Sequence, residues 1–147
     1  MLTNWRPWQY TVFDLLKEQN SYIEYIYYKG SIGKNVITKY LSYYGFAHQI
    51  PTINSYSMTM KYVMEMPKIG TYVINISKSK ADKSMDRLYT ALEEVKIGYA
   101  ESSEFNFEFF DSPNIIVFST KPPDDSINNA KRQWRIWTIE KDQLIPA

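Results

Sequence analysis

The sequence predicts an α/β fold with a mainly parallel central sheet flanked by helices. Two observations support this prediction. Short apolar strands alternate along the chain with segments of helical periodicity, which is the pattern of a parallel sheet covered on both faces. The length of 147 residues suits one compact domain with a sizeable core.

Apolar residues at helical spacing predict four helices, in order over residues 8–19, 34–44, 55–66 and 84–96. Apolar, β-branched and aromatic runs predict five strands of the sheet, in order over residues 22–28, 46–50, 71–76, 114–119 and 133–139. Gly45 is a suitable stop for the second helix, and Pro51, Pro67 and Gly70 separate the elements around the third.

Residues 104–110 alternate charged or polar with aromatic side chains, which predicts one arm of a solvated hairpin. The predicted fold therefore includes a hairpin insertion near 100–111. Ligands of parallel sheets bind beyond the carboxyl ends of the strands. Three loops are expected there, at residues 29–34, 77–83 and 120–132.

Composition excludes several classes of site. The formal net charge is +1, so no overall basic field indicates nucleic acid. The chain has no cysteine, which excludes disulfide scaffolds and thiolate metal sites and leaves an intracellular compartment as the default. His48 is the only histidine, so neither a zinc site nor a Ser-His-Asp triad is expected. We interpret His48 as a polar residue at a strand edge, with a titratable switch as the alternative.

No signal peptide is expected, because the start of the chain lacks a basic segment followed by an apolar run. No segment has the length and apolar character of a membrane span, so no membrane partner is expected.

Six short segments follow one another in a characteristic order. They are RPWQ (6–9), GSIGKN (30–35), YVINIS (72–77), YTALEEVKIGY (89–99), NIIVFSTKPPD (114–124) and RQWRIWTI (132–139). Each resembles a segment of one family. The first three resemble its tryptophan-glutamine opening (6–9), Walker A loop (30–35) and Walker B strand (72–77). The last three resemble its Glu-x-x-Lys-x-Gly element (89–99), sensor strand (114–124) and closing Asp-Arg-Trp segment (132–139). This family is the helicase domain of the replication initiator (Rep) proteins of circular single-stranded DNA viruses. None of the segments is specific alone, but six in the same order are.

The resemblance implies a superfamily-3, AAA+-type P-loop ATPase fold. It implies one degenerate helicase domain over residues 1–147, without the endonuclease domain that lies upstream in the family. It assigns the vestigial nucleotide-binding positions to Gly30, Ser31, Ile32, Gly33, Lys34 and Asn35. In this assignment Lys34 would neutralise phosphate oxygens, and Gly30 and Gly33 would let main-chain amides surround a phosphate at the helix start.

Several positions depart from the family pattern. Asn35 stands where a Ser or Thr hydroxyl should ligate Mg²⁺, and Asn75 replaces the Walker B carboxylate. Thr120 occupies the place of the sensor asparagine. Arg132 and Gln133 stand where the closing Asp-Arg pair is expected, so the arginine finger is either lost or displaced by one residue. An arginine finger alone is worth about 10³–10⁵ in rate.

These departures predict hydrolysis close to background, no assigned catalytic residue and no metal site. Asp82, Glu93 and Glu94 are acids that could compensate, but the two glutamates lie far along a helix and are expected to be solvated. We expect that no cofactor is required, and that any bound ATP would be held with weak or no Mg²⁺ coordination.

Nucleic-acid binding is expected to be weakened. The predicted hairpin contains no Lys or Arg, and its four acids are Glu101, Glu104, Glu108 and Asp111. Acids placed against phosphates oppose binding. Its aromatic residues are Phe105, Phe107 and Phe109. They could stack on bases, but packing within the protein or a protein interface is favoured. Six other basic residues predict either phosphate contacts or a solvated face, namely Lys78, Lys80, Lys83, Lys131, Arg132 and Arg135.

Two functions remain open from the sequence. The first is a Rep-like helicase domain with a degraded ATP site, a pseudo-ATPase derived from a viral DNA-replication initiator, which would work in the host nucleus if viral. The alternative is a captured structural or scaffolding subunit of a larger protein or ribonucleoprotein complex. Both predict a homo- or hetero-oligomer with protein partners. A third, weaker possibility is that nucleotide binds without hydrolysis and orders the oligomer.

Overall fold

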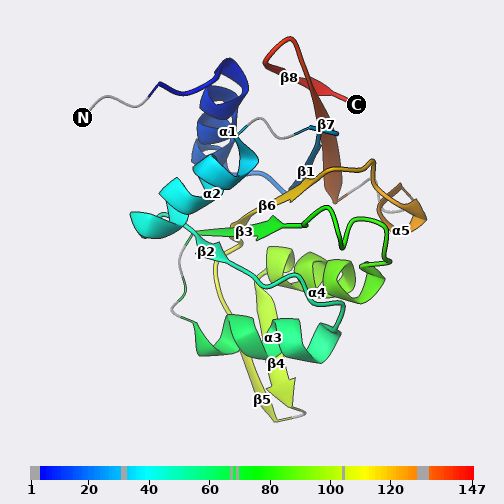
Figure 1. Cartoon of the computed structure of the whole chain (residues 1–147). Helices are drawn as coiled ribbons and strands as arrows, with labels where there is room; N and C mark the ends of the chain where they lie inside the picture. Colours follow the sequence, from blue (N-terminus) through cyan, green and yellow to red (C-terminus); the bar gives the residue numbers. More distant parts are fainter. Residues whose placement is uncertain (1–3, 31–32, 67, 69, 104, 129–132) are drawn as a thin grey trace.

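The computed structural model describes residues 4–30, 33–66, 68, 70–103, 105–128 and 133–147. Its centre is a six-stranded sheet in the order β2-β3-β6-β1-β7-β8, in which neighbours are parallel except for β7 and β8. These strands are β1 (Ile23–Tyr27), β2 (His48–Gln49), β3 (Thr71–Asn75), β6 (Asn114–Ser119), β7 (Trp134–Glu140) and β8 (Gln143–Pro146). A separate hairpin consists of β4 (Tyr99–Ser103) and β5 (Asn106–Phe109). The helices are α1 (Pro7–Lys17), α2 (Lys34–Tyr43), α3 (Tyr56–Glu65), α4 (Asp86–Ile97) and α5 (Asp125–Asn128), as Figure 1 shows.

The central strands are buried on both faces. In β1 and β3 only the last residue is more than slightly exposed, and in β6 only the first is. Strands of this kind must be covered by helices on each side. The prediction of a mainly parallel α/β sheet flanked by helices is therefore confirmed.

Two helical layers enclose the sheet (Figure 1). On one face α1 and α2 pack against the strands, and this core includes Trp8, Val12, Ile26, Ile37 and Phe118. On the other face lie α3 and α4, and this core includes Met60, Val63, Leu88, Leu92 and Ile115. Over the described residues no helix has the length and apolar character needed to cross a bilayer.

The structure differs from the sequence prediction in three elements. The strand expected over 46–50 is only the two-residue edge strand β2, and α5 lies inside the segment expected to be a loop. Strand β8 was not predicted. It joins β7 through Lys141 and Asp142, which have positive φ angles of 49° and 61°. This is a tight hairpin turn without the Asn-Gly or Asp-Gly pair that signals one.

The hairpin insertion expected near 100–111 is confirmed. It begins at Gly98, which ends α4 with a φ of +102°. A Cβ atom on Gly98 would lie 2.2 Å from the main-chain oxygen of Phe110, so glycine is required here. The Phe110 amide donates to the Gly98 carbonyl at 2.9 Å, which closes the hairpin at its base.

Candidate functional site

The loops that follow β1, β3 and β6 converge at one edge of the sheet. Strand β6 lies between β1 and β3 and is parallel to both, so the three carboxyl ends meet. The segments expected to carry the phosphate loop, the Walker B position and the sensor position therefore begin at this edge. This is the part of a parallel sheet where ligands usually bind.

Gly33 forms the junction between the glycine-rich turn and α2. It is the N-cap of α2 with a φ of +99°, and the Gln9 side-chain amide donates to its carbonyl at 3.0 Å. A Cβ atom at Gly33 would lie 2.6 Å from Gln9 Nε2. The buried Gln9 also accepts a hydrogen bond from the Arg6 amide at 2.8 Å. The opening segment of the chain thus supports the turn, while Ser31 and Ile32 lie outside the described residues.

Lys34, the first residue of α2, is buried. Its ammonium group donates to the carbonyl of Tyr28 at 3.1 Å and to the carbonyl of Ser119 at 2.9 Å. These carbonyls lie at the ends of β1 and β6. Burial lowers the pKa of Lys34. In this conformation the Lys34 ammonium donates to two main-chain carbonyls that join the ends of β1 and β6.

Asn35 and Asn75 face each other across the edge. The Asn75 Nδ2 atom donates to Asn35 Oδ1 at 2.6 Å. These are the two positions at which the family resemblance expects metal ligands. Here they form a neutral amide pair, and within the described parts of the chain no cluster of three or more His, Cys, Asp or Glu side chains could hold a metal ion.

The sensor and finger positions lie at opposite edges of the sheet. Thr120 directly follows β6, and its hydroxyl is buried with no hydrogen-bond partner among the described residues. Gln133 precedes β7 at the amino edge, where its carbonyl accepts from the Ile23 amide and its side-chain amide donates to the Glu93 carbonyl at 3.5 Å. The length of β1, about 15 Å, separates it from Lys34. Gln133 is therefore too far from Lys34 to act beside it in the same chain, and Arg132 lies outside the described residues.

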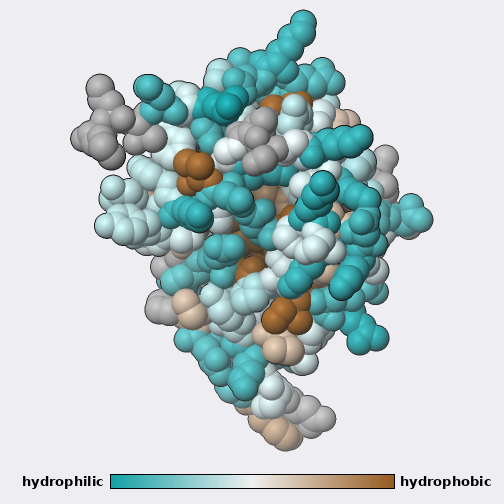
Figure 2. All heavy atoms as spheres, in the orientation of Figure 1, coloured by the Kyte–Doolittle hydropathy of each residue, from teal (hydrophilic) through white to brown (hydrophobic). Residues whose placement is uncertain are grey.

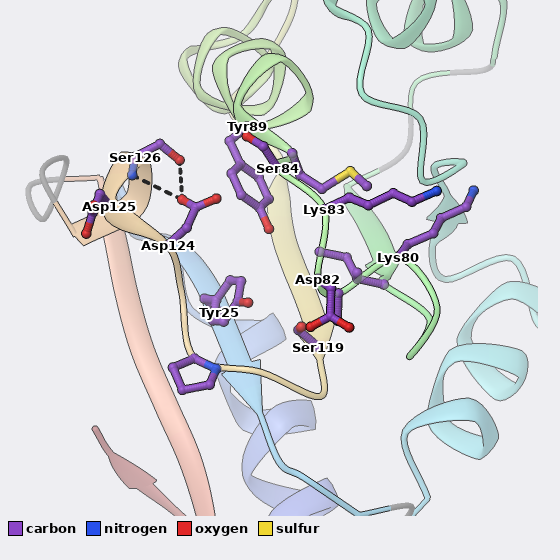
Figure 3. A pocket seen from close by; sticks show the side chains of 14 residues that line it. Tyr25, Lys80, Asp82, Lys83, Ser84, Tyr89, Ser119, Asp124, Asp125 and Ser126 are labelled. Atoms are coloured by element: carbon purple, nitrogen blue, oxygen red, sulfur yellow. Dashed lines mark hydrogen bonds between the residues drawn. The ribbon is translucent and has the colours of Figure 1, made fainter.

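A pocket of about 380 Å³ opens at the carboxyl edge beside α4 (Figure 3). Tyr25 and Tyr89 form its floor, and burial raises the pKa of both hydroxyls. The Tyr25 hydroxyl donates to the Lys121 carbonyl at 2.9 Å. Figure 3 places Asp124 on one side of the pocket and Lys80 and Lys83 on the other.

The pocket is lined by groups that can form hydrogen bonds with a ligand. Its tyrosines remain protonated at neutral pH and can donate or accept hydrogen bonds. Asp124 is engaged with Ser126, whose amide donates to its carboxylate at 3.0 Å. The Ser126 hydroxyl donates to the same carboxylate, so the pocket holds a hydroxyl beside a carboxylate, with no histidine among its described lining residues.

The expectation that Glu93 is solvated is wrong. Its carboxylate accepts a hydrogen bond from the indole of the buried Trp134 at 2.8 Å, because α4 packs along the start of β7. Asp82 pairs with Lys121 at the surface. Among the described residues, neither acid forms a hydrogen bond with Asn35 or Asn75, whose side chains pair with each other.

The element that resembles Glu-x-x-Lys-x-Gly acts as a clamp in this structure. Besides Glu93, it includes the buried Lys96, whose ammonium donates to the Pro113 carbonyl at 2.6 Å. Gly98 closes the base of the hairpin, as described above. The element therefore joins α4 to β7, to the start of β6 and to the hairpin.

Arg135 was expected either to contact phosphate or to be solvated, and the structure shows neither. It forms a two-pronged ion pair with the buried Glu24, with Nε–Oε1 and NH2–Oε2 distances of 2.7 and 2.5 Å. The Trp137 indole donates to the same carboxylate at 3.0 Å. The signal in the sequence was a single acid inside an otherwise apolar strand, which must find partners when buried.

The remaining basic candidates are dispersed. Lys80 donates to the Thr52 carbonyl at 2.8 Å, while Lys78 and Lys83 are exposed. Lys131 lies outside the described residues. Tyr25 and Tyr89 were missed as pocket residues, because in the sequence they look like ordinary core positions of a strand and a helix.

Comparisons of the chain with models of protein families, with curated proteins and with solved structures find no match.

Proposed function

We propose that the chain is a Rep-like superfamily-3 helicase domain with a degraded ATP site, a pseudo-ATPase derived from a viral DNA-replication initiator. The observation that carries the proposal is the hydrogen bond between Asn75 and Asn35. Two residues far apart in the sequence meet where a P-loop ATPase needs a hydroxyl and a carboxylate around Mg²⁺.

The arrangement of the motif segments also supports the proposal. Walker A, Walker B and sensor positions must share one edge to act on one nucleotide, and β1, β3 and β6 bring residues 34, 75 and 120 to the same edge. The opening segment supports Gly33 through Gln9, and the Glu93–Gly98 element holds the hairpin. The shared edge of residues 34, 75 and 120 therefore supports the proposal.

Loss of hydrolysis follows from charge. The metal would face two neutral amides instead of a hydroxyl and a carboxylate, so its binding loses the one anionic ligand of the pair. The position of Gln133 at the amino edge means that any finger residue could serve only a neighbouring copy. We expect turnover indistinguishable from background.

The test combines fluorescent-ATP titration, with and without Mg²⁺, and phosphate release. Wild type should release phosphate no faster than Lys34→Ala. The variant Asn35→Thr/Asn75→Asp should gain Mg²⁺-dependent nucleotide binding, whereas Asn35→Ala/Asn75→Ala, which only breaks the amide pair, should not. Phosphate release by wild type that is abolished by Lys34→Ala would contradict the proposal.

A second candidate function is that of a structural subunit kept for its interaction surfaces. The observation that favours it is the hairpin, whose Phe105, Phe107 and Phe109 are all exposed. Exposed apolar surface of this kind is typical of a site that binds another protein.

A further inference from the structure

One arm of the hairpin presents a phenylalanine face, which we define as Phe105, Phe107 and Phe109. Their exposed fractions are 91%, 52% and 75%. The Phe107 and Phe109 rings contact each other and Tyr99 on the adjacent strand. Figure 2 shows the hairpin as a projection from the lower end of the molecule, beyond the body formed by the sheet and helices.

A second apolar surface lies between α1 and α2. It is a groove of about 570 Å³, and its aromatic lining residues are Trp5, Tyr10, Phe13, Tyr40 and Phe46. We call it the aromatic groove. Its rings contact one another, with centroids 4.8 Å apart for Trp5–Tyr40 and 5.1 Å apart for Trp5–Phe13. Tyr10 and Phe46 remain more than half exposed.

These two surfaces cannot cover each other within one chain. The aromatic groove belongs to the helical layer formed by α1 and α2, whereas the hairpin lies with α3 and α4 on the other side of the sheet (Figure 1). Only another molecule can bury either surface. A second copy of the chain offers each surface the missing counterpart.

The charges around the two surfaces are complementary. The segment from residue 97 to residue 120 contains no Lys or Arg. Its described acids are Asp111, which is exposed, Glu108, which pairs with Lys68, and Glu101, which accepts hydrogen bonds from Tyr56 and Tyr99.

At the groove, Lys17 lines one end, and Lys39 lies on α2 next to Tyr40. Both lysines are exposed, and neither forms an ion pair with another described residue. Asp14 is the one acid among the described residues that line the groove. The lining charges Lys17 and Asp14 balance, so the positive charge at the groove comes from Lys39 beside it, whereas the hairpin segment is acidic.

We propose that the phenylalanine face of one copy docks into the aromatic groove of a second copy. The contact is heterologous, since each chain contributes one surface and keeps the other free, so it propagates into rings or filaments. The inference rests on the second candidate function and is independent of the nucleotide site.

The area available sets the strength of this contact. A fully exposed aromatic side chain can bury about 200 Å², so the three phenylalanines offer about 400 Å² at their exposed fractions. With an equal contribution from the groove, the contact buries about 800 Å², which is less than the roughly 1,000 Å² of a stable interface and corresponds to a weak, transient one. Association should be visible at protein concentrations on the order of 0.1–1 mM.

Sedimentation velocity of the full chain, without nucleotide, tests the proposal across that concentration range. The hairpin variant is Phe105→Ser/Phe109→Ser, and the groove variant is Tyr10→Ser/Phe46→Ser. Val36→Ser is the matched control, because it removes an exposed apolar side chain of α2 that belongs to neither surface. Wild type and Val36→Ser should associate, and each double variant alone should remain monomeric.

The decisive sample is an equimolar mixture of the two double variants. One retains a working groove and the other a working hairpin, so the mixture should form dimers and stop there. Formation of dimers also shows that both variants are folded. Monomeric wild type at about 1 mM, or a mixture that stays monomeric while wild type associates, would overturn the proposal and leave the hairpin to a different partner.

Discussion

Replacing Lys34 by methionine separates two roles for this lysine. Methionine keeps an unbranched apolar stem but removes the charge and all three donors. If Lys34 now holds the ends of β1 and β6 together, the variant loses stability in the absence of any ligand. If Lys34 serves only to bind phosphate, the free energy of unfolding is unchanged. Substitutions that remove no native contact usually change it by less than about 0.5 kcal/mol.

The magnitude follows from the two hydrogen bonds of the ammonium group. The Ser119 carbonyl also accepts from the Tyr28 amide at 3.1 Å, so it keeps a partner in the variant. The Tyr28 carbonyl loses the bond of 3.1 Å from Lys34. Hydrogen bonds of a charged donor contribute about 1.5–3 kcal/mol, and release of the buried charge offsets part of this. We expect Lys34→Met to lower the free energy of unfolding by about 2 kcal/mol.

Urea unfolding followed by tryptophan fluorescence measures this difference. With a dependence of about 2 kcal/mol per molar urea, the midpoint should fall by about 1 M. Lys39→Met, an exposed lysine of the same helix, is the matched control and should shift the midpoint by less than about 0.25 M. Equal midpoints for wild type and Lys34→Met would refute the assignment of Lys34 to the sheet edge.

Three further predictions concern the clamp and the tyrosines. Gly98→Ala should lower the free energy of unfolding in urea by more than about 2 kcal/mol, because the new Cβ atom meets a main-chain oxygen. Gly45→Ala is the control and should lower it by about 1 kcal/mol, because Gly45 has a φ of +72° but open space around it. Glu93→Ala should cost about 1–3 kcal/mol in the same assay by leaving the buried Trp134 indole unpaired, and Glu93→Gln should cost less. Burial and a hydrogen bond to Glu101 raise the pKa of Tyr56 to about 12. Burial also raises the pKa values of Tyr25, Tyr72 and Tyr89, and the hydrogen bond to Glu101 raises the pKa of Tyr99. The unfolded chain therefore loses these protons first, so stability should fall as pH rises from about 10 to about 12, as urea midpoints and tyrosinate absorbance at matched pH would show.

The sequence allowed the sheet to be predicted because its central strands are continuously apolar. The runs that became β1, β3 and β6 needed no tertiary information, and the alternating aromatic pattern of β5 identified the hairpin. Strand β8 was missed because its turn uses Lys141 and Asp142 in left-handed conformations, which no local preference indicates. Edge strand β2 was predicted too long, since pairing with β3 and not composition limits it to two residues.

The candidate site was predictable in position but not in its hydrogen bonds. Loop order placed Lys34, Asn35 and Asn75 near one edge, and parallel strands made that inference safe. The side-chain amide bond between Asn35 and Asn75, and the capture of Lys34 by two carbonyls, depend on the sheet register. The pocket at Tyr25 and Tyr89 had no signal, because pocket-lining and core tyrosines look alike in sequence.

The hydrogen bonds of Lys34 and the Asn35–Asn75 pair at the sheet edge are related. In an ATP site, a lysine ammonium is balanced by phosphate and the metal by a carboxylate. Under the proposed function, Asn75 stands where such a site has its carboxylate, and the Lys34 ammonium instead donates to the carbonyl oxygens at the ends of β1 and β6. Those carbonyls and the Asn35 Oδ1 atom have partners within the protein, so a nucleotide that contacts Lys34, Asn35 and Asn75 must first break three hydrogen bonds. At about 0.5–1.5 kcal/mol for each, more for the charged pair, this lowers nucleotide affinity by at least tenfold even where the loop keeps its shape.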